Sequence, residues 1–405
     1  MNKVFLISFL ILVLFASCEK NADQTYTLKF YGDAYEDIGY SVTIVTDGYV
    51  IAGQVEDIIR DGNYISGSNK NMGIIKTGWD GNVTWKRSMG GKFDDRGSKI
   101  YQDPDGSLIC VGTFTDTTTL IPVQTDVYVV KVSASGTIEW QKHYGGAGNQ
   151  TGKDIVKTPD GYMILGSTNV GREPVTASTG NTSGKTDIFL LKINAVGDSL
   201  ESFAYGYPGN DVGVTIKPDL GGNFIVFGTT DMSNPDQDKN NMLLVKINPV
   251  GYTTEPVIIG EKKDEYAADL EVLADGYLIA GTIIKDDGNQ EIFVSKLKND
   301  IYADPYFTPP ITITGSNSAG VYALTKYRTN SFLLAGYSGT GLSTRMLVFE
   351  LDAEGNQVEG HQMIKGSSGT QVAYDVVSGD DEYIIAVGKN SYDVNSMITF
   401  LKFRF

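Results

Sequence analysis

A short apolar phrase that ends in glycine recurs along the chain. It is five residues long, it occurs seven times, and its closing glycines are 52 to 62 residues apart. The copies occupy residues 49–53, 108–112, 162–166, 224–228, 277–281, 332–336 and 384–388. A repeat of this length predicts one supersecondary unit per copy, with neighbouring units stacked so that each buries a face of the next.

The residues around each phrase predict short antiparallel strands. In the second repeat, a strand at 98–102 and a turn at 103–106 precede the phrase, and strands at 126–132 and 137–143 follow it. Asp-Gly pairs between apolar strands favour hairpin turns. The phrase itself is apolar at nearly every position, so both of its faces must be covered. Four antiparallel strands per repeat are typical of a blade of a β-propeller.

The two ends of the chain complement each other in this pattern. Residues 397–405 have the pattern of a third strand, and no fourth strand follows. Residues 25–30 precede the first repeat and occupy the position of a fourth strand. We therefore predict an all-β fold, a seven-bladed β-propeller with four antiparallel strands per blade, whose last blade is closed by the N-terminal strand. The alternative is an open solenoid, which would need capping repeats that the sequence does not contain.

The first residues are typical of an export signal. Lys3 precedes an apolar stretch at residues 4–15, which is too short to span a bilayer comfortably. Residues 14–18 (LFASC) resemble the lipobox of bacterial lipoproteins, with Phe15 where leucine is most common. This resemblance implies cleavage before Cys18 and lipidation of Cys18, and the alternative is an ordinary secretory signal. The predicted segments are a signal peptide at 1–17, a lipidated linker at 18–24 and the propeller at 25–405.

The repeat also resembles a known group of exported proteins. The elements that carry the resemblance are Tyr144-Gly145-Gly146, the stretch 160–166 and the strand 187–192, with variants in the other repeats. They are similar to the exported β-propeller repeat lipoproteins of the Bacteroidota. The resemblance implies a lipid-anchored protein of the cell envelope, on the periplasmic or surface face of the outer membrane. It implies no particular activity, because propellers host many activities.

Charge and side-chain chemistry exclude several classes of function. The net charge is −16 and no cluster of lysine and arginine stands out, so we expect no nucleic-acid partner. Cys110 lies in an apolar strand and is expected to be a core residue. His143 and His361 are the only histidines, and their spacing matches neither a zinc site nor a His-based triad. The sequence thus identifies no catalytic residue. Separately, we expect the protein to be a monomer.

Two series of polar residues recur in equivalent positions. The first series precedes the inner strand of each blade and consists of Asp37, Asp95, Gln150, Asp211, Glu265, Ser318 and Gln371. We expect it around one mouth of the channel, where its carboxylates form a candidate ligand site or calcium site. The alternative is that each residue caps its own turn.

The second series is found in the third strands. It opens each strand with Asn71, Asp126, Asp187, Asn241 or Glu291, and the residue five positions on is Lys76, Lys131, Lys192, Lys246 or Lys296. Arg345 and Glu350 replace the two ends in the sixth repeat. Because a catalytic residue normally occurs once, we assign the second series to structure.

The remaining sequence signal is the length of the connections. Residues 54–70, 113–125 and 167–186 are predicted to be long loops, and long loops on a rigid scaffold often carry binding sites. We therefore predict a lipid-anchored binding module whose partner is a polysaccharide, a peptide or an envelope protein, and whose contact with the membrane is the lipid anchor alone. One alternative is a carbohydrate-active enzyme with carboxylates at the channel mouth. Another is a purely structural envelope protein.

Overall fold

The computed structural model describes residues 25–32, 35–61, 64–116, 124–169, 186–207, 209–231, 239–248, 256–260, 263–298, 306–307, 318–392 and 395–405. In this part of the chain every regular element is a β-strand. There are five four-stranded sheets and one eight-stranded sheet. The predicted signal peptide, the linker and Cys18 lie outside the described residues.

The five four-stranded sheets follow one another along the chain, and each is an antiparallel meander. The first contains β2 (Ile38–Val45), β3 (Gly48–Asp61), β4 (Tyr64–Thr77) and β5 (Val83–Met89). The second contains β6 (Arg96–Gln102), β7 (Leu108–Asp116), β8 (Gln124–Val132) and β9 (Ile138–Tyr144). The third contains β10 (Gln150–Thr158), β11 (Gly161–Thr168), β12 (Asp187–Asn194) and β13 (Ser199–Tyr205). The fourth contains β14 (Asp211–Pro218), β15 (Phe224–Thr230), β16 (Asn241–Ile247) and β17 (Val257–Ile259). The fifth contains β18 (Asp264–Leu273), β19 (Gly276–Ile284), β20 (Gln290–Lys298) and β21 (Tyr306–Phe307).

The eight-stranded sheet holds the last two repeats and the N-terminal strand. One half contains β22 (Ala319–Lys326), β23 (Ser331–Thr340), β24 (Ser343–Asp352) and β25 (Gln357–Lys365). The other half contains β26 (Thr370–Ser378), β27 (Ile384–Tyr392), β28 (Asn395–Phe403) and β1 (Thr27–Tyr31). A single parallel pair, Thr344 with Thr370, joins the halves. The strand β1 pairs antiparallel with β28 along its whole length, from Thr27 opposite Lys402 to Tyr31 opposite Ile398.

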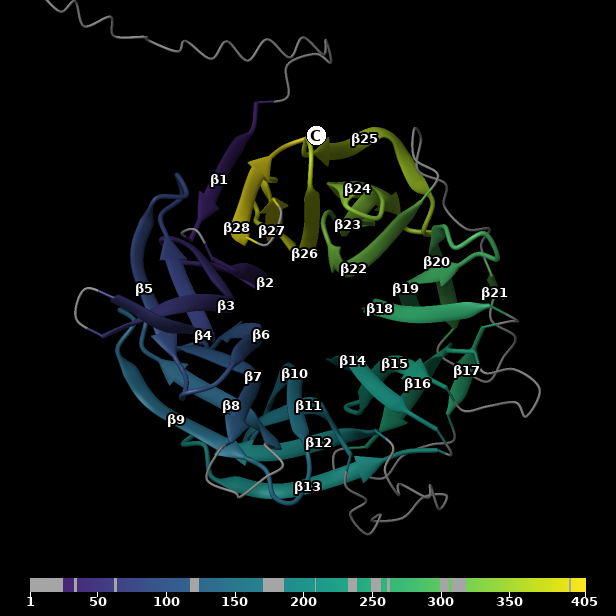
Figure 1. The fold of residues 1–405 in the computed structure, drawn as a ribbon. Coiled ribbons are helices and arrows are strands. Elements are labelled where there is room, and N and C mark those ends of the chain that lie inside the picture. Colours follow the sequence, from purple (N-terminus) through teal and green to yellow (C-terminus); the bar gives the residue numbers. More distant parts are fainter. Residues whose placement is uncertain are drawn as a thin grey trace, which may run out of the picture.

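The sheets are arranged around a central opening, and the first strand of each repeat lies innermost (Figure 1). These inner strands are β2, β6, β10, β14, β18, β22 and β26, and each contacts the next one in this order. The predicted all-β fold with four-stranded antiparallel repeats is therefore confirmed.

The apolar phrases form the core, and both of their faces are covered. In β3, Val50 and Ala52 pack with Leu108 of the following sheet. The alternating residues Tyr49 and Ile51 pack on the other side, against β27 and β28. Burial on both faces explains why the phrase is apolar at consecutive positions and does not alternate.

The glycine that ends each phrase marks an irregularity in the inner strand. In the first sheet Gly39 is opposite Gly53 and Ser41 is opposite Ala52, so Tyr40 is an extra residue, a β-bulge. A Cβ atom on Gly53 would lie only 1.9 Å from the carbonyl oxygen of Ile38. The other six phrase glycines meet a backbone oxygen of their inner strand at 1.8 to 2.6 Å in the same way. Glycine is required there because the bulge brings the two backbones close together.

One predicted loop is wrong. Residues 54–70 were expected to form a long polar connection, but β3 and β4 continue through most of this stretch as a hairpin. Of the other two predicted loops, residues 117–123 and 170–185 lie outside the described part of the chain. For the residues that are described, no helix has the length and apolarity needed to span a bilayer.

Candidate functional site in the central channel

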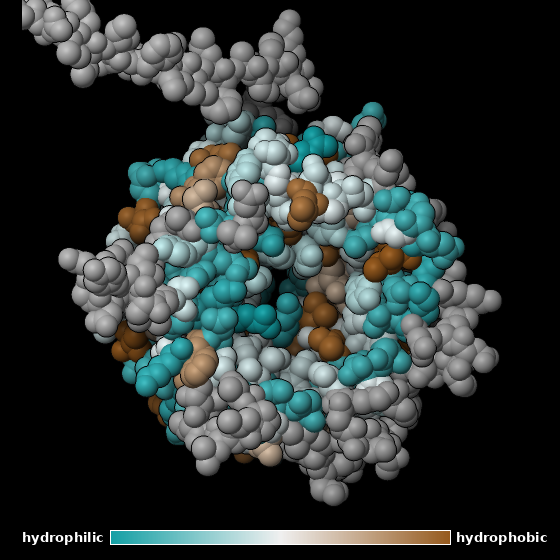
Figure 2. Space-filling view, viewed as in Figure 1, coloured by the Kyte–Doolittle hydropathy of each residue, from teal (hydrophilic) through white to brown (hydrophobic). Residues whose placement is uncertain are grey.

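The central opening holds a cavity of about 770 Å³. The bulge in each inner strand supplies one residue to its wall, namely Tyr40, Ser98, Lys153, Val214, Ala268, Tyr322 and Tyr374. We call these seven residues the bulge ring. Figure 2 shows the hollow in the centre of this face, with hydrophilic residues along its left rim. The bulge re-aims one side chain per inner strand, so the ring is a direct product of the repeat.

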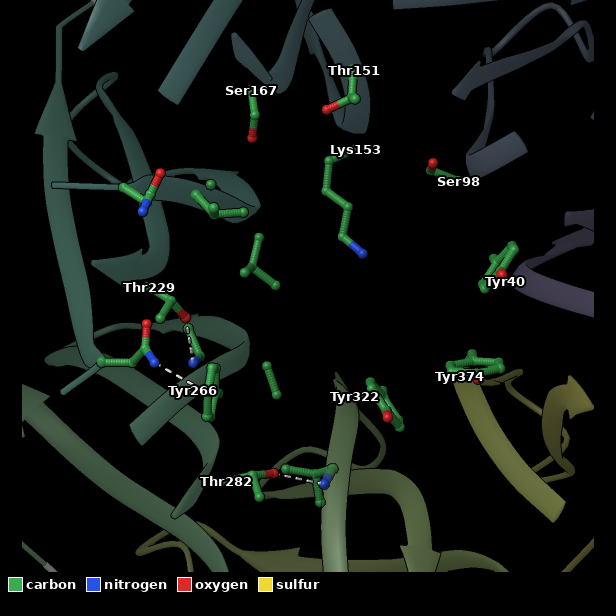
Figure 3. Close-up of a pocket in the computed structure, with 18 of the residues that line it drawn as sticks. Tyr40, Ser98, Thr151, Lys153, Ser167, Thr229, Tyr266, Thr282, Tyr322 and Tyr374 are labelled. Atoms are coloured by element: carbon green, nitrogen blue, oxygen red, sulfur yellow. Dashed lines mark hydrogen bonds between the residues drawn. The ribbon is translucent and has the colours of Figure 1, made fainter. Parts of the chain in front are cut away.

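One side of the cavity is aromatic. Tyr40, Tyr374, Tyr322 and Tyr337 follow one another with ring centroids 5.2, 4.9 and 5.9 Å apart. We call these four residues the tyrosine arc. Burial raises the pKa of Tyr337 to about 12 and raises the pKa of the other three. The phenols are therefore neutral hydrogen-bonding groups on apolar rings at physiological pH. Tyr266 lies across the cavity from Tyr374 (Figure 3).

The wall formed by β6 and β10 carries two cations. Arg96 and Lys153 line the cavity, and both side chains are exposed to it. Neither forms a hydrogen bond or ion pair with the residues that the structure describes. The surrounding protein lowers the pKa of Lys153 by desolvation, and the nearby Arg96 guanidinium lowers it further. Figure 3 shows the Lys153 side chain reaching into the open space. This wall is suited to a negatively charged group.

The position that follows the bulge has a different role. It is occupied by Ser41, Lys99, Asp154, Thr215, Asp269, Ala323 and Asp375, which we call the staple ring. In Asp154 one oxygen accepts a hydrogen bond from the Ile155 amide at 2.8 Å, and the other accepts one from the Ile216 amide of the next inner strand at 2.9 Å. Asp269 bonds the amides of Leu270 and Leu324 in the same manner. These aspartates connect neighbouring sheets.

The third such aspartate connects the last repeat with the first. Asp375 accepts hydrogen bonds from the Ser41 hydroxyl at 2.9 Å and from the Val42 amide at 3.0 Å. Lys99 lies 3.3 Å from the same carboxylate oxygen. Burial alone would lower the pKa of Lys99, but the carboxylates of Asp375 and Asp154 outweigh burial and raise it. The positive charge of Lys99 is thus balanced by the neighbouring carboxylates.

The predicted ligand residues do not lie in the cavity wall. Asp37, Asp95, Gln150, Asp211 and Glu265 are at most 3% exposed. Asp95 accepts hydrogen bonds from the backbone amides of Gly91 and Thr115, both at 2.6 Å. Asp37 accepts from the Glu56 amide, Asp211 from the Tyr207 amide, and Gln150 donates to the Ala147 carbonyl. Their role in ligand binding stays a prediction, and so does a calcium ion. Among the described residues no group of three or more His, Cys, Asp or Glu side chains is placed to hold a metal.

The structure brings the two polar series together in pairs. A Cβ atom on Gly90 would lie 2.3 Å from Asn71 Oδ1 and 2.4 Å from Asp95 Oδ2, so the two side chains flank this glycine. Gly260 is flanked in the same way by Asn241 and Glu265. A residue of the second series therefore lies beside the first-series residue of the next repeat. In each case the glycine directly follows the fourth strand of its sheet, Gly90 after Met89 and Gly260 after Ile259.

One pair differs from the others because both members are acidic. Asp187 is fully buried, and neither of its carboxylate oxygens has a hydrogen-bond partner among the residues that the structure describes. Burial raises the pKa of Asp187 to about 6, and the charge of Asp211 contributes to the increase. Asn71 and Asn241 occupy the equivalent position in two other sheets.

The recurring lysines are structural, as predicted. Lys76 pairs with Asp47, and Lys131, Lys246 and Lys296 pair with Asp103, Asp219 and Asp275 at 3.4, 2.8 and 3.3 Å. Lys192 pairs with Glu201. In the sixth repeat the charges are exchanged, since Glu350 pairs with Arg328 at 3.5 Å. Each of the four aspartates lies in or next to the turn before a phrase, so these lysines fasten turns.

Comparisons with known proteins identify the fold. No family model matches the chain, and no curated protein matches it. A solved structure of the Neurospora crassa Pan2 WD40 domain is similar, with 10% identity, a TM-score of 0.52 and coverage of 95% of this chain and 96% of that one. WD40 domains are β-propellers. The chain has the β-propeller fold.

Two further structures agree with this assignment. A puromycin hydrolase matches with 12% identity and a TM-score of 0.53, and Raptor from Chaetomium thermophilum matches with 9% identity and a TM-score of 0.52. The matches cover 88% and 91% of this propeller but only 51% and 28% of those chains. At such low identity the likeness concerns the fold alone.

Proposed function

We propose that this protein is a seven-bladed propeller, closed by its N-terminal strand, that binds a saccharide ligand in its central channel. The pairing of β1 with β28 supports closure, and so do the bonds from Asp375 to Ser41 and Val42. A closed ring leaves no free inner edge and holds the channel walls in fixed positions.

The bulge ring is the observation that carries the binding function. Its seven members are equivalent in position but include three tyrosines, a lysine and a serine. The staple ring, one residue further along, contains the groups that hold neighbouring blades together. Side chains that the scaffold does not use, gathered on the wall of one cavity, are the usual composition of a ligand site. The cavity volume of about 770 Å³ is within the range of roughly 300–1,000 Å³ common for such sites.

The tyrosine arc favours a saccharide over other ligands. A sugar ring presents C–H groups on its faces and hydroxyls around its rim. The tyrosine rings can pack against the faces, and the phenols, together with Ser98 and Thr151 in the same wall, can bond the rim hydroxyls. Binding without turnover is the proposed activity, because Asp95 and Asp211, on which an enzyme would rely, are buried against backbone amides.

The proposed cellular location rests on the first 18 residues. The lipobox-like LFASC and its Cys18 support a lipid-anchored protein of the cell envelope. A lipid anchor would place the propeller beside the polysaccharides of the envelope or its surroundings.

The test is a binding screen of the full mature chain against oligosaccharides, with peptides and envelope proteins in the same panel and product release measured in parallel. Tyr322→Ala removes a channel residue that is 44% exposed, and Phe30→Ala removes an equally exposed aromatic residue, at 43%, on β1. We expect the Tyr322 variant to lose saccharide binding at least tenfold and the Phe30 variant to retain it. Equal affinity in the two variants would place the site elsewhere. Binding of peptides alone would replace the saccharide, and turnover would replace the binding-only function.

A further inference from the structure

The central cavity and an adjoining groove differ in charge from the rest of the protein. The chain has 49 acidic residues and a net charge of −16. Among the described residues, however, no aspartate or glutamate lines the central cavity, whereas Arg96 and Lys153 do. An adjoining groove of about 310 Å³ also lacks acidic residues and contains Lys389. Cations without carboxylates, on an otherwise acidic protein, indicate a site for an anion.

The lysines of three successive inner strands, β6, β10 and β14, fall into two groups. Lys99 and Lys217 belong to pairs, with Asp375 at 3.3 Å and with Glu271 at 3.4 Å. Lys153, on the strand between theirs, has no hydrogen bond or ion pair with a described residue. Desolvation and the nearby Arg96 guanidinium lower the pKa of Lys153, although Asp154 and Asp269 act in the opposite direction, and a bound anion would stabilise both cations. A charge held in this state is available for a ligand and contributes nothing to the scaffold.

The groove extends the site beyond the channel. It shares Tyr322, Tyr337, Tyr374 and Gln290 with the central cavity, so three of the four tyrosines of the arc border both spaces. Its other lining residues include Gly339 at the end of β23, Val372 of β26 and Lys389 of β27. A ligand longer than the channel can therefore continue outward across β23 and β27, as an oligomer would.

We propose that the channel binds the end of a carboxylate-bearing oligosaccharide. A carboxylate of the oligosaccharide lies between Arg96 and Lys153, and its sugar rings pack along the tyrosine arc. The sugar units that follow occupy the groove near Lys389. This inference rests on the saccharide-binding function proposed above and specifies the chemical class of the saccharide.

The test compares trigalacturonate with its methyl ester, which has the same rings without the charges. Binding is measured by calorimetry with the mature chain and with Lys153→Gln, Arg96→Gln and Lys153→Arg. The matched control is Lys86→Gln, which removes the same charge from an exposed lysine on β5. We expect each glutamine variant in the channel to weaken trigalacturonate binding about tenfold, in line with the loss of a charge-assisted hydrogen bond. Lys153→Arg and Lys86→Gln should stay within twofold of the unmodified chain.

The outcomes separate the two proposals. If trigalacturonate and its ester bind equally well, or if a neutral saccharide binds best, the acidic class is overturned and saccharide binding stands. If no saccharide binds, the function proposed above falls. Thermal unfolding of each variant checks that the channel is intact, and added salt should weaken binding of the acid but not of the ester.

Discussion

The bulge ring and the staple ring are adjacent in sequence and opposite in behaviour. Asp154 bonds the amides of Ile155 and Ile216 and is buried, whereas Lys153, one residue earlier, is exposed in the channel and has no described partner. Tyr374 and Asp375 show the same contrast in the last repeat. The difference arises because the bulge turns one residue away from the hydrogen-bonded ladder, and the next residue returns to it. A position that recurs in every repeat is therefore not structural for that reason alone. The hydrogen bonds of its side chain determine whether it holds the scaffold together.

The largest effect is expected from removing a staple. Asp375→Ala leaves the Val42 amide, the Ser41 hydroxyl and the Lys99 charge without their shared partner. The loss should lower the free energy of unfolding by about 3–5 kcal/mol, because two buried donors lose their acceptor and the partly exposed Lys99 loses its ion-pair partner. Denaturant unfolding measures it. Ala323 occupies the equivalent position in β22, so a methyl group itself is tolerated there, and a loss below about 1 kcal/mol would contradict the staple role.

The second effect concerns the glycine opposite the bulge. Gly166→Ala places a Cβ atom 1.8 Å from the Thr151 carbonyl oxygen, so the backbone must move. We expect a loss of about 3 kcal/mol in unfolding free energy. The control is Gly288→Ala, where the added Cβ atom has no other atom within 4 Å. This variant should lose only about 1 kcal/mol of unfolding free energy, because its backbone has a positive φ of 80°. Equal losses in the two variants would show that close approach of the backbones is not the reason for the phrase glycine.

A third variant should stabilise the protein. Asp187→Asn replaces a buried carboxylate that accepts no hydrogen bond from a described residue, and it should raise the free energy of unfolding by about 2 kcal/mol at pH 7. The folded pKa of about 6 exceeds the ordinary 3.8, so the folded state binds more protons between these values. The wild type should therefore gain stability relative to the variant as the pH falls from 7 to 4, and the two should converge near pH 4.

The control for this variant is Asp126→Asn at the equivalent position in β8. Asp126 has a partner, since its carboxylate lies 2.9 Å from His143 Nδ1. We expect no gain there. A gain of the same size in both variants would show that the pairing with Asp211 is not the cause.

The smallest effect on stability is expected at the bulge ring. Lys153→Ala should change the free energy of unfolding by less than about 0.5 kcal/mol, because this side chain holds nothing in place. Asp154→Ala, one residue away, should cost about 3 kcal/mol. Chemical denaturation of the two variants is the sharpest comparison that the chain offers. Similar losses would remove the distinction between the two rings.

The sequence carried enough information for the fold. The seven phrases and the Asp-Gly turns specify local strands and hairpins, and the strand at 25–30 matches the partner that β28 has in the structure. The exception was the stretch 54–70, where Asp61-Gly62 is itself a hairpin signal inside a polar segment. The polar composition of this stretch predicts a loop, but β3 and β4 remain paired through most of it.

The channel wall was harder to predict from the same data. A bulge shifts the facing of every later residue by one, so alternation along an inner strand does not identify the channel side. The signal was nevertheless present. The glycine at the end of each phrase marks where the inner strand bulges. In the first sheet Gly39 lies opposite the phrase glycine Gly53, and the next residue, Tyr40, is the bulged residue that lines the channel. The pairing of Asp95 with Asn71 could not be predicted, because it joins residues of two repeats.

The glycine at the end of each phrase also bears on how such a protein can diversify. Because the bulged residue is outside the ladder of hydrogen bonds, its identity can change without altering the register of any strand. Each of the seven positions around the cavity can therefore be varied independently of the others. A library that varies only these positions would sample new ligand preferences on an unchanged framework.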